Sequence, residues 1–143
     1  MTVLDFQLFE NRAKILHIFD FDGTLVKKSH KFDQDAVKDP QPVKKWFQKF
    51  KSLLDTQESD VVVLTARGKE RPVRDALRKL GITKRVKIVA LGNAQDSAKG
   101  EYIKSQFARK YEEIRFYDDN EEYVKKAREI MRDVPVKFIV TQA

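Results

Sequence analysis

Apolar residues along this chain follow two patterns that alternate from one end to the other. Short, nearly continuous apolar runs are typical of buried strands, whereas apolar residues three or four positions apart are typical of helices packed on one side. The continuous runs predict five strands, at residues 15–21, 60–65, 86–91, 114–117 and 136–140.

Between these runs, apolar residues at helical spacing predict four helices. The first covers residues 42–54, with Pro42 in its first turn, a position where proline loses no hydrogen bond. The others cover residues 73–80, a stretch that begins near residues 97–100 and reaches Tyr111, and residues 124–131. Gly81 is placed to cap the second of these helices at its C-terminus.

This alternation indicates an α/β fold, in which right-handed crossovers connect the strands of a parallel sheet and helices cover both faces. The length suits one compact domain over residues 1–143. Residues 1–13 fit neither pattern and are left open, either as a strand-like lead-in or as a contact for a partner.

Composition narrows the class of protein. The chain has no cysteine, so it contains no disulfide framework and no thiolate metal site. Its apolar runs are far shorter than the roughly 20 residues that cross a bilayer, and no secretory signal opens it, so we expect a cytoplasmic protein without membrane contact. The net charge of +7 favours a polyanionic or phosphorylated partner, although a lysine-rich surface also aids solubility, and charge alone leaves both open.

Polar side chains gather where the predicted strands end. Asp20 and Asp22 close the first strand, Thr65 closes the second, and Asp118 and Asp119 follow the fourth. Open α/β sheets bind their ligands in the crevice beyond the carboxyl ends of the strands, so these residues point to a functional site. A turn with capping aspartates would also explain the first pair, and a helix N-cap would also explain the second.

The string Asp20-Phe21-Asp22-Gly23-Thr24-Leu25 resembles the first motif of the haloacid dehalogenase (HAD) superfamily of phosphohydrolases. The resemblance implies a Rossmann-like fold with strand order 5-4-1-2-3. It also implies that Asp20 attacks phosphorus to form an aspartyl phosphate, and that Asp22 protonates the leaving oxygen and then activates water. Thr65 matches the second motif, whose hydroxyl holds a phosphoryl oxygen.

The same resemblance implies a Mg²⁺ ion. Its ligands would be Asp20, Asp118 and the backbone carbonyl of Asp22, with Asp119 acting through water or orienting the other ligands. The third motif is a lysine that stabilises negative charge. Two lysines lie in the interval between the third and fourth strands, and we favour Lys104 over Lys99 for this role.

No interval between the motifs is long enough for the cap domain that encloses small substrates in many relatives. With this open site, the order of motifs is similar to the 3′-phosphatase domain of polynucleotide kinase-phosphatases and to related RNA-repair proteins. By this resemblance, the substrate would contact Gly23, Thr24, Lys31, Ala66 and Arg67. The chain departs from that group in lacking the kinase domain, in having Thr65-Ala66 where Ser-Gly is frequent, and in having Lys31 where an arginine is usual.

The sequence therefore predicts a Mg²⁺-dependent phosphomonoesterase that acts on polynucleotide 3′-phosphate ends, as a monomer or a small homo-oligomer. A phosphatase of nucleotides, other small phosphate esters or phosphoprotein is an alternative, and a non-catalytic nucleic-acid-binding module is a second one. His17, in the middle of the first strand, faces away from the Asp20 side by alternation and is interpreted as a core residue.

Overall fold

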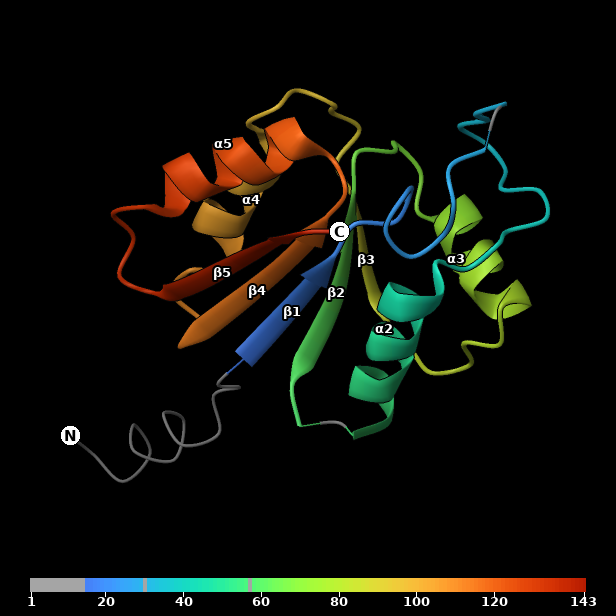
Figure 1. Cartoon of the computed structure of the whole chain (residues 1–143), viewed down its shortest axis with the longest axis horizontal. Coiled ribbons are helices and arrows are strands. Elements are labelled where there is room, and N and C mark those ends of the chain that lie inside the picture. The colour runs from blue at the N-terminus through green and yellow to red at the C-terminus, as the bar shows by residue number, and fades with distance from the viewer. Residues whose placement is uncertain (1–14, 30, 57) are drawn as a thin grey trace.

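The computed structural model describes residues 15–29, 31–56 and 58–143, so the unassigned residues 1–13 lie outside the described part. Figure 1 shows the elements of this part along the chain. They are β1 (Ile15–Phe19), α2 (Lys44–Thr56), β2 (Asp60–Thr65), α3 (Arg71–Lys79), β3 (Lys87–Ala90), α4 (Ala98–Gln106), β4 (Glu113–Asp118), α5 (Glu121–Met131) and β5 (Lys137–Gln142).

The five strands form one parallel sheet in the order β3-β2-β1-β4-β5. Read from the other edge, this order is the expected 5-4-1-2-3, so the predicted α/β, Rossmann-like fold is confirmed. β1 lies in the centre, with Ile18 opposite Val62 of β2 and Phe116 of β4. The end of β1 is therefore flanked on both sides by the ends of its neighbours.

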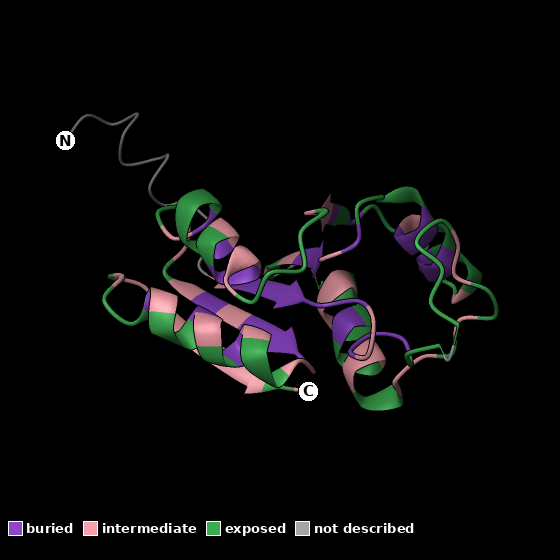
Figure 2. Cartoon of the chain, turned by 90° about the horizontal axis from the view of Figure 1, so that it is seen from above, coloured by how far each residue is buried: buried purple, intermediate pink, exposed green. Residues whose placement is uncertain are grey.

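Helices cover both faces of the sheet. Alternate side chains of each strand point to opposite faces, so the strands contribute apolar side chains to both. Leu16 and Ile18 of β1 pack in one apolar cluster with residues of α4 and α5, whereas Phe19 packs in a second cluster with residues of α2 and α3. Seen from above, the strands are mostly buried, and the outer faces of the helices are exposed (Figure 2).

α4 and α5 pack closely at Gly100. A Cβ atom built on Gly100 would lie 3.0 Å from the Cα atom of Ala127 and closer still to a methyl group of Ile130. A larger residue would therefore push the first turn of α4 away from α5, and with it the neighbouring Lys99.

Several boundaries differ from the prediction, among them those of β1, α2 and α4. β1 ends at Phe19 rather than at Phe21, because the chain turns at once into a tight loop in which Phe21 accepts a backbone hydrogen bond from Leu25. α2 begins at Lys44, and Pro42 lies outside it, in an isolated bridge to Val26. Tyr111 lies beyond α4, which ends at Gln106.

No cap domain interrupts the described part of the fold. Between β1 and α2 the described residues form turns and isolated bridges, without a helix, and between β2 and β3 the only helix is α3. In the described residues, the carboxyl edge of the sheet is therefore not covered by a separate domain.

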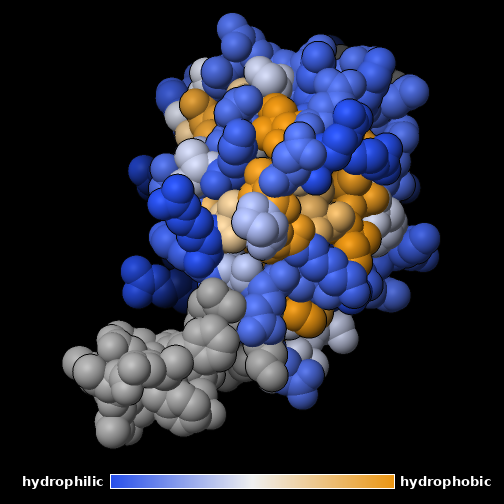
Figure 3. Space-filling view, turned by 90° about the vertical axis from the view of Figure 1, so that its left-hand side faces the viewer, coloured by the Kyte–Doolittle hydropathy of each residue, from blue (hydrophilic) through white to orange (hydrophobic). Residues whose placement is uncertain are grey.

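The outer edge of the sheet at β5 carries half-buried apolar side chains, those of Phe138, Ile139 and Val140. Figure 3 shows apolar surface between polar side chains on this side of the molecule. Within the described residues, no helix combines the length and the apolar character needed to cross a lipid bilayer.

Candidate active site

The aspartates singled out from the sequence meet at the carboxyl edge of the sheet. Asp20 follows β1 directly, and its backbone N–H donates to the Tyr117 carbonyl of β4 over 2.9 Å. Asp118 is the last residue of β4. Asp20 is 6% exposed and Asp118 is fully buried, so both carboxyl groups need partners inside the protein.

Lys99 is that partner. Its Nζ atom lies 2.7 Å from Oδ1 of Asp20 and 2.7 Å from Oδ2 of Asp118, and the side chain is 1% exposed. The Nζ atom also lies 4.9 Å from the centre of the Tyr123 ring. One buried ammonium thus bridges two buried carboxyl groups, an arrangement in which removal of any member leaves the others without compensation.

The structure places Lys99, and not the favoured Lys104, beside Asp20 and Asp118. Lys104 is exposed on α4, whereas Lys99 lies in the first turn of that helix, next to the carboxyl edge of the sheet. Five residues turn a helix by about 140°, so the two lysines point in different directions, and the buried side near Lys104 is occupied by Ile103.

Burial and charge act together on these groups. Burial raises the pKa of Asp20 well above its usual range; the Lys99 ammonium opposes this shift and the Asp118 carboxylate adds to it. Burial by itself lowers the pKa of Lys99, but the carboxylates of Asp20 and Asp118 outweigh it, so the pKa rises and the ammonium stays charged.

Gly23 and Thr24 connect the loops that carry Asp20 and Asp119. Gly23 has φ +85°, and a Cβ atom built on it would overlap the Asp119 carboxylate, so this position requires glycine. The Thr24 hydroxyl lies 3.2 Å from Oδ2 of Asp20 and accepts a hydrogen bond from the Asp119 backbone N–H over 3.1 Å. Both residues were expected to contact substrate, but Thr24 is fully buried and neither lines the hollow beside Asp20.

Asp22 is held by Arg67 rather than by the buried lysine. Nε and Nη2 of Arg67 donate to the two carboxylate oxygens of Asp22 over 2.7 and 2.9 Å, and Nη1 donates to the Asp33 carbonyl over 2.7 Å. The Thr65 hydroxyl oxygen accepts from the Arg67 backbone N–H over 3.2 Å, which fixes the start of this loop. Arg67 is also buried, and these hydrogen bonds fix its guanidinium in position.

A hollow of about 280 Å³ opens beside these groups. Its walls come from the loops after β1, β2 and β4 and from the helices α4 and α5. The lining residues are Asp20, Asp22, Lys28, Phe32, Gln34, Thr65, Ala66, Arg67, Lys99, Asp119, Asn120 and Tyr123. Six of the predicted residues (Asp20, Asp22, Thr65, Ala66, Arg67 and Asp119) are thus brought together. Lys31 is exposed and lines a neighbouring hollow instead.

Three carboxylates at this edge can hold a metal ion. Asp20, Asp118 and Asp119 each offer an oxygen atom, and these oxygens lie within 4.8 Å of one another. Hard carboxylate oxygens suit cations such as Mg²⁺ or Ca²⁺. The carboxylate of Asp22, paired with Arg67, is not part of this cluster.

Several residues at the site were not assigned to it from the sequence. Lys28 lies 3.2 Å from the Asp119 carboxylate, and Asn120 caps α5 by accepting from the Tyr123 backbone N–H over 3.1 Å. Phe32 lies against Arg67 and Tyr123 against Lys99. Lys28 alone carried a signal, as part of a lysine-rich loop just after the first motif.

His17 lies outside the site, as expected. It is buried in β1, and its Nδ1 atom lies 2.9 Å from the Tyr117 hydroxyl. Burial, together with the positive charges of Arg115 and Lys49, lowers its pKa to about 4, so the imidazole is neutral at pH 7.

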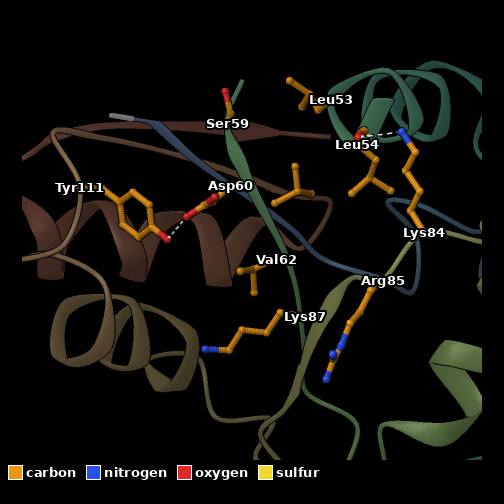
Figure 4. A pocket seen from close by; sticks show the side chains of 10 residues that line it. Leu53, Leu54, Ser59, Asp60, Val62, Lys84, Arg85, Lys87 and Tyr111 are labelled. Atoms are coloured by element: carbon orange, nitrogen blue, oxygen red, sulfur yellow. Dashed lines mark hydrogen bonds between the residues drawn. The ribbon is translucent and has the colours of Figure 1, made fainter. Parts of the chain in front are cut away.

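A larger hollow, of about 590 Å³, lies at the opposite end of the strands and is lined by residues of β2, the end of α2 and the segment before β3 (Figure 4). Its charged groups form ordinary surface contacts: Asp60 accepts from the Tyr111 hydroxyl over 2.6 Å, and Lys84 donates to the Leu54 carbonyl over 3.3 Å. The described residues place no carboxylate cluster there.

Comparison with known proteins shows a similarity of fold and does not assign the chain to a family. No protein-family model matches the chain, and no curated protein matches it either. Among solved structures, the chain is similar to one chain in the structure of the Pnkp1/Rnl/Hen1 RNA repair complex, with a TM-score of 0.63 and 18% sequence identity. The similarity covers 92% of the present chain and 43% of the other, so this chain spans less than half of the length of that one.

Proposed function

We propose that this protein is a Mg²⁺-dependent phosphomonoesterase of the HAD type that acts on polynucleotide 3′-phosphate ends through a phosphorylated aspartate. The observation that carries the proposal is the buried Asp20 carboxyl group, joined by Lys99 to Asp118 and open on one side to a hollow. A structural ion pair has no need of an opening to solvent, whereas a nucleophile requires one.

In the first step, a carboxylate oxygen of Asp20 forms a bond to phosphorus and the bond between phosphorus and the leaving oxygen breaks. Lys99 stays charged and stabilises the negative charge that crowds around Asp20 and the phosphoryl group. The Thr65 hydroxyl oxygen already accepts a backbone hydrogen bond, so its own hydrogen is left to donate to a phosphoryl oxygen. The adjacent amide of Ala66 is assigned to the same group.

Asp22 supplies the proton to the leaving oxygen and, in the second step, removes one from the water that attacks the aspartyl phosphate. That attack releases inorganic phosphate and restores the Asp20 carboxylate. Because Arg67 holds both oxygens of Asp22, one of these hydrogen bonds has to give way when Asp22 acts as an acid. Arg67 is thus assigned to the control of Asp22 as well as to the binding of substrate.

Mg²⁺ fits the residues present. Asp20, Asp118 and Asp119 would hold it, with the backbone carbonyl of Asp22 as a further ligand. When bound, the ion supplies positive charge that offsets the clustered carboxylates and the phosphate oxygens.

Polynucleotide ends are the favoured substrate class for two reasons. No cap domain covers the carboxyl edge of the sheet in the described residues, and exposed Lys27, Lys28 and Lys31 line the two hollows at this edge. The solved structure similar to this chain belongs to an RNA repair complex, which supports a role in RNA repair.

Small phosphate esters are the second candidate. The hollow beside Asp20 measures about 280 Å³, which is enough for a phosphate group with a small leaving group. A partner subunit that closes the opening would favour such substrates.

The test is phosphate release, with Mg²⁺, from matched oligonucleotides that carry a 3′- or a 5′-phosphate, beside mononucleotides and p-nitrophenyl phosphate. Release mainly from 3′-ended oligonucleotides supports the proposal. Release from the small substrates alone contradicts the polynucleotide assignment and leaves the chemistry intact, and no release from any substrate contradicts both.

Asp20→Asn protein and a chelator serve as negative controls, because each removes a component that the chemistry requires. Asp75→Asn, an exposed carboxylate on α3, is the matched control for a change of charge and should retain full activity.

A further inference from the structure

Phe32 is the one large hydrophobic side chain that is exposed in the described residues, with 63% of its surface accessible. A single exposed apolar residue is ordinary on a protein surface. Phe32 differs in its position, because it lines the hollow beside Asp20 and also the neighbouring hollow.

One face of the Phe32 ring is supported from below. The guanidinium carbon of Arg67 lies 4.4 Å from the centre of this ring and 5.8 Å from that of the buried Phe21. Hydrogen bonds to Asp22 and to the Asp33 carbonyl hold the guanidinium in place. The exposed ring therefore rests on a fixed cation, and its accessible surface faces away from that support.

Phe32 also lies where two hollows join. The first, of about 280 Å³, contains Asp20, and the second, of about 800 Å³, contains Lys27, Lys31 and Lys38. Asp22, Phe32, Gln34 and Arg67 line both. A chain that places its end at Asp20 therefore passes Phe32 before it reaches the lysines.

We propose that Phe32 is a stacking platform for the base of the terminal nucleotide, and that the strand continues over Lys27, Lys31 and Lys38. This inference rests on the proposed function and names the single-stranded end as the substrate. Bases stack on aromatic side chains with little regard to sequence, and the positive charge of Arg67 behind the ring strengthens the platform. The lysines meet the phosphates that follow.

The same geometry connects recognition to chemistry. The terminal base and the leaving 3′ oxygen belong to one nucleoside, and Arg67 contacts both Phe32 and Asp22, the residue that protonates that oxygen. A base on Phe32 places the leaving oxygen on the Asp22 side of Arg67. A phosphorylated end without a base cannot use this support.

The test compares two single-stranded oligonucleotides with a 3′-phosphate that differ only in the terminal nucleotide, which either carries its base or is abasic. Phe32→Leu keeps an apolar side chain without a ring, and Phe32→Trp keeps an aromatic one. We expect Phe32→Leu to raise KM for the base-bearing substrate about tenfold or more and to leave KM for the abasic substrate unchanged. Phe32→Trp should behave like the wild type.

A second measurement needs no turnover. Asp20→Asn protein is titrated with an oligonucleotide whose terminal base is 2-aminopurine, which loses fluorescence when it stacks. We expect quenching on binding, and we expect Phe32→Leu to abolish the quenching while binding persists through the lysines.

An equal loss of activity on both substrates in Phe32→Leu would overturn the inference, because the ring would then serve only to seat Arg67. Unchanged kinetics and quenching in that variant would overturn it as well. Failure of the proposed function has a different signature, since the wild-type protein would then release phosphate from neither oligonucleotide.

Discussion

The two ends of the parallel sheet carry hollows of different size and different chemistry. The hollow at the amino ends of the strands measures about 590 Å³, whereas the hollow beside Asp20 measures about 280 Å³ and adjoins one of about 800 Å³. Its charged groups, among them Asp60 and Lys84, are exposed. At the carboxyl ends, Asp20, Asp118 and Lys99 are buried and depend on one another.

This difference teaches that buried, paired charges identify the site better than the size of a hollow does. Burying a charge is costly unless it is paired, so a protein retains buried charges where their removal from water serves a purpose. The first loops after β1, β2 and β4 leave the sheet at one edge and bring their polar groups together there. In the hollow at the amino ends, the charged groups are paired by surface contacts, which contribute little to stability.

The largest effect is expected from Asp20→Asn, compared with Asp60→Asn at the other end. Loss of the nucleophile should lower kcat by about 10⁴-fold or more, whereas Asp60→Asn should leave kcat unchanged. Phosphate release from the best substrate measures both, with circular dichroism to establish that each variant folds. Equal activity of the two variants would remove Asp20 from its proposed role.

The next effect separates two lysines on one helix. Lys99→Met leaves Asp20 and Asp118 without their shared cation, so we expect about 3–5 kcal/mol of lost stability and a loss of kcat of about 10²-fold or more. Lys104→Met changes an exposed side chain and should alter stability by less than about 0.5 kcal/mol. Urea unfolding and phosphate release measure the pair, and similar behaviour of both variants would contradict the assignment of Lys99.

The sequence could predict the fold and most of the site, but it could not distinguish these two lysines. The sheet and its order could be predicted, because strands buried on both faces appear as continuous apolar runs and because the motifs fall at their ends. The convergence of Asp20, Thr65 and Asp118 followed from the same rule, that the carboxyl ends of parallel strands meet at one edge.

The choice between Lys99 and Lys104 could not be made in this way. It depends on where α4 begins and on the close packing of Gly100 against Ala127, which are tertiary features. The pairing of Asp22 with Arg67, 45 positions apart, also arises only once the loops after β1 and β2 have been placed. Contacts between loops leave no periodic signal in a sequence, so Phe32 and its contact with Arg67 were missed as well.

A third prediction concerns His17, which lies in the sheet between the two ends. Its pKa in the folded protein is about 4, against 6.5 for an ordinary histidine, because of burial and of the charges of Arg115 and Lys49, which Glu113 partly opposes. The unfolded chain therefore binds a proton at a higher pH than the folded one does. The contribution to stability is complete above about pH 6.5 and is lost as the pH falls toward 4, by up to about 3 kcal/mol.

Urea unfolding between pH 7.5 and 4.5 measures this loss, and His17→Gln should show a smaller one over the same range. Phosphate release at pH 7.5 should be unchanged in His17→Gln, because the imidazole does not face the site. An activity loss in a folded His17→Gln protein would contradict the separation of this residue from the carboxyl edge.

The smallest effect tests which end of the sheet meets the polyanion. Lys31→Ala removes a charge from the hollow that adjoins the one beside Asp20, and Arg85→Ala removes one from the hollow at the amino ends of the strands. If the strand leaves the site past Phe32, Lys31→Ala should raise KM for a 3′-phosphorylated oligonucleotide a few-fold and reduce the dependence of KM on salt, because one phosphate contact is lost. Arg85→Ala should change neither quantity, and p-nitrophenyl phosphate, which has no strand, should not distinguish the two variants. A larger effect from Arg85→Ala would contradict this path, because the strand would then bind at the amino ends of the strands of the sheet, in the hollow that has no buried charged groups.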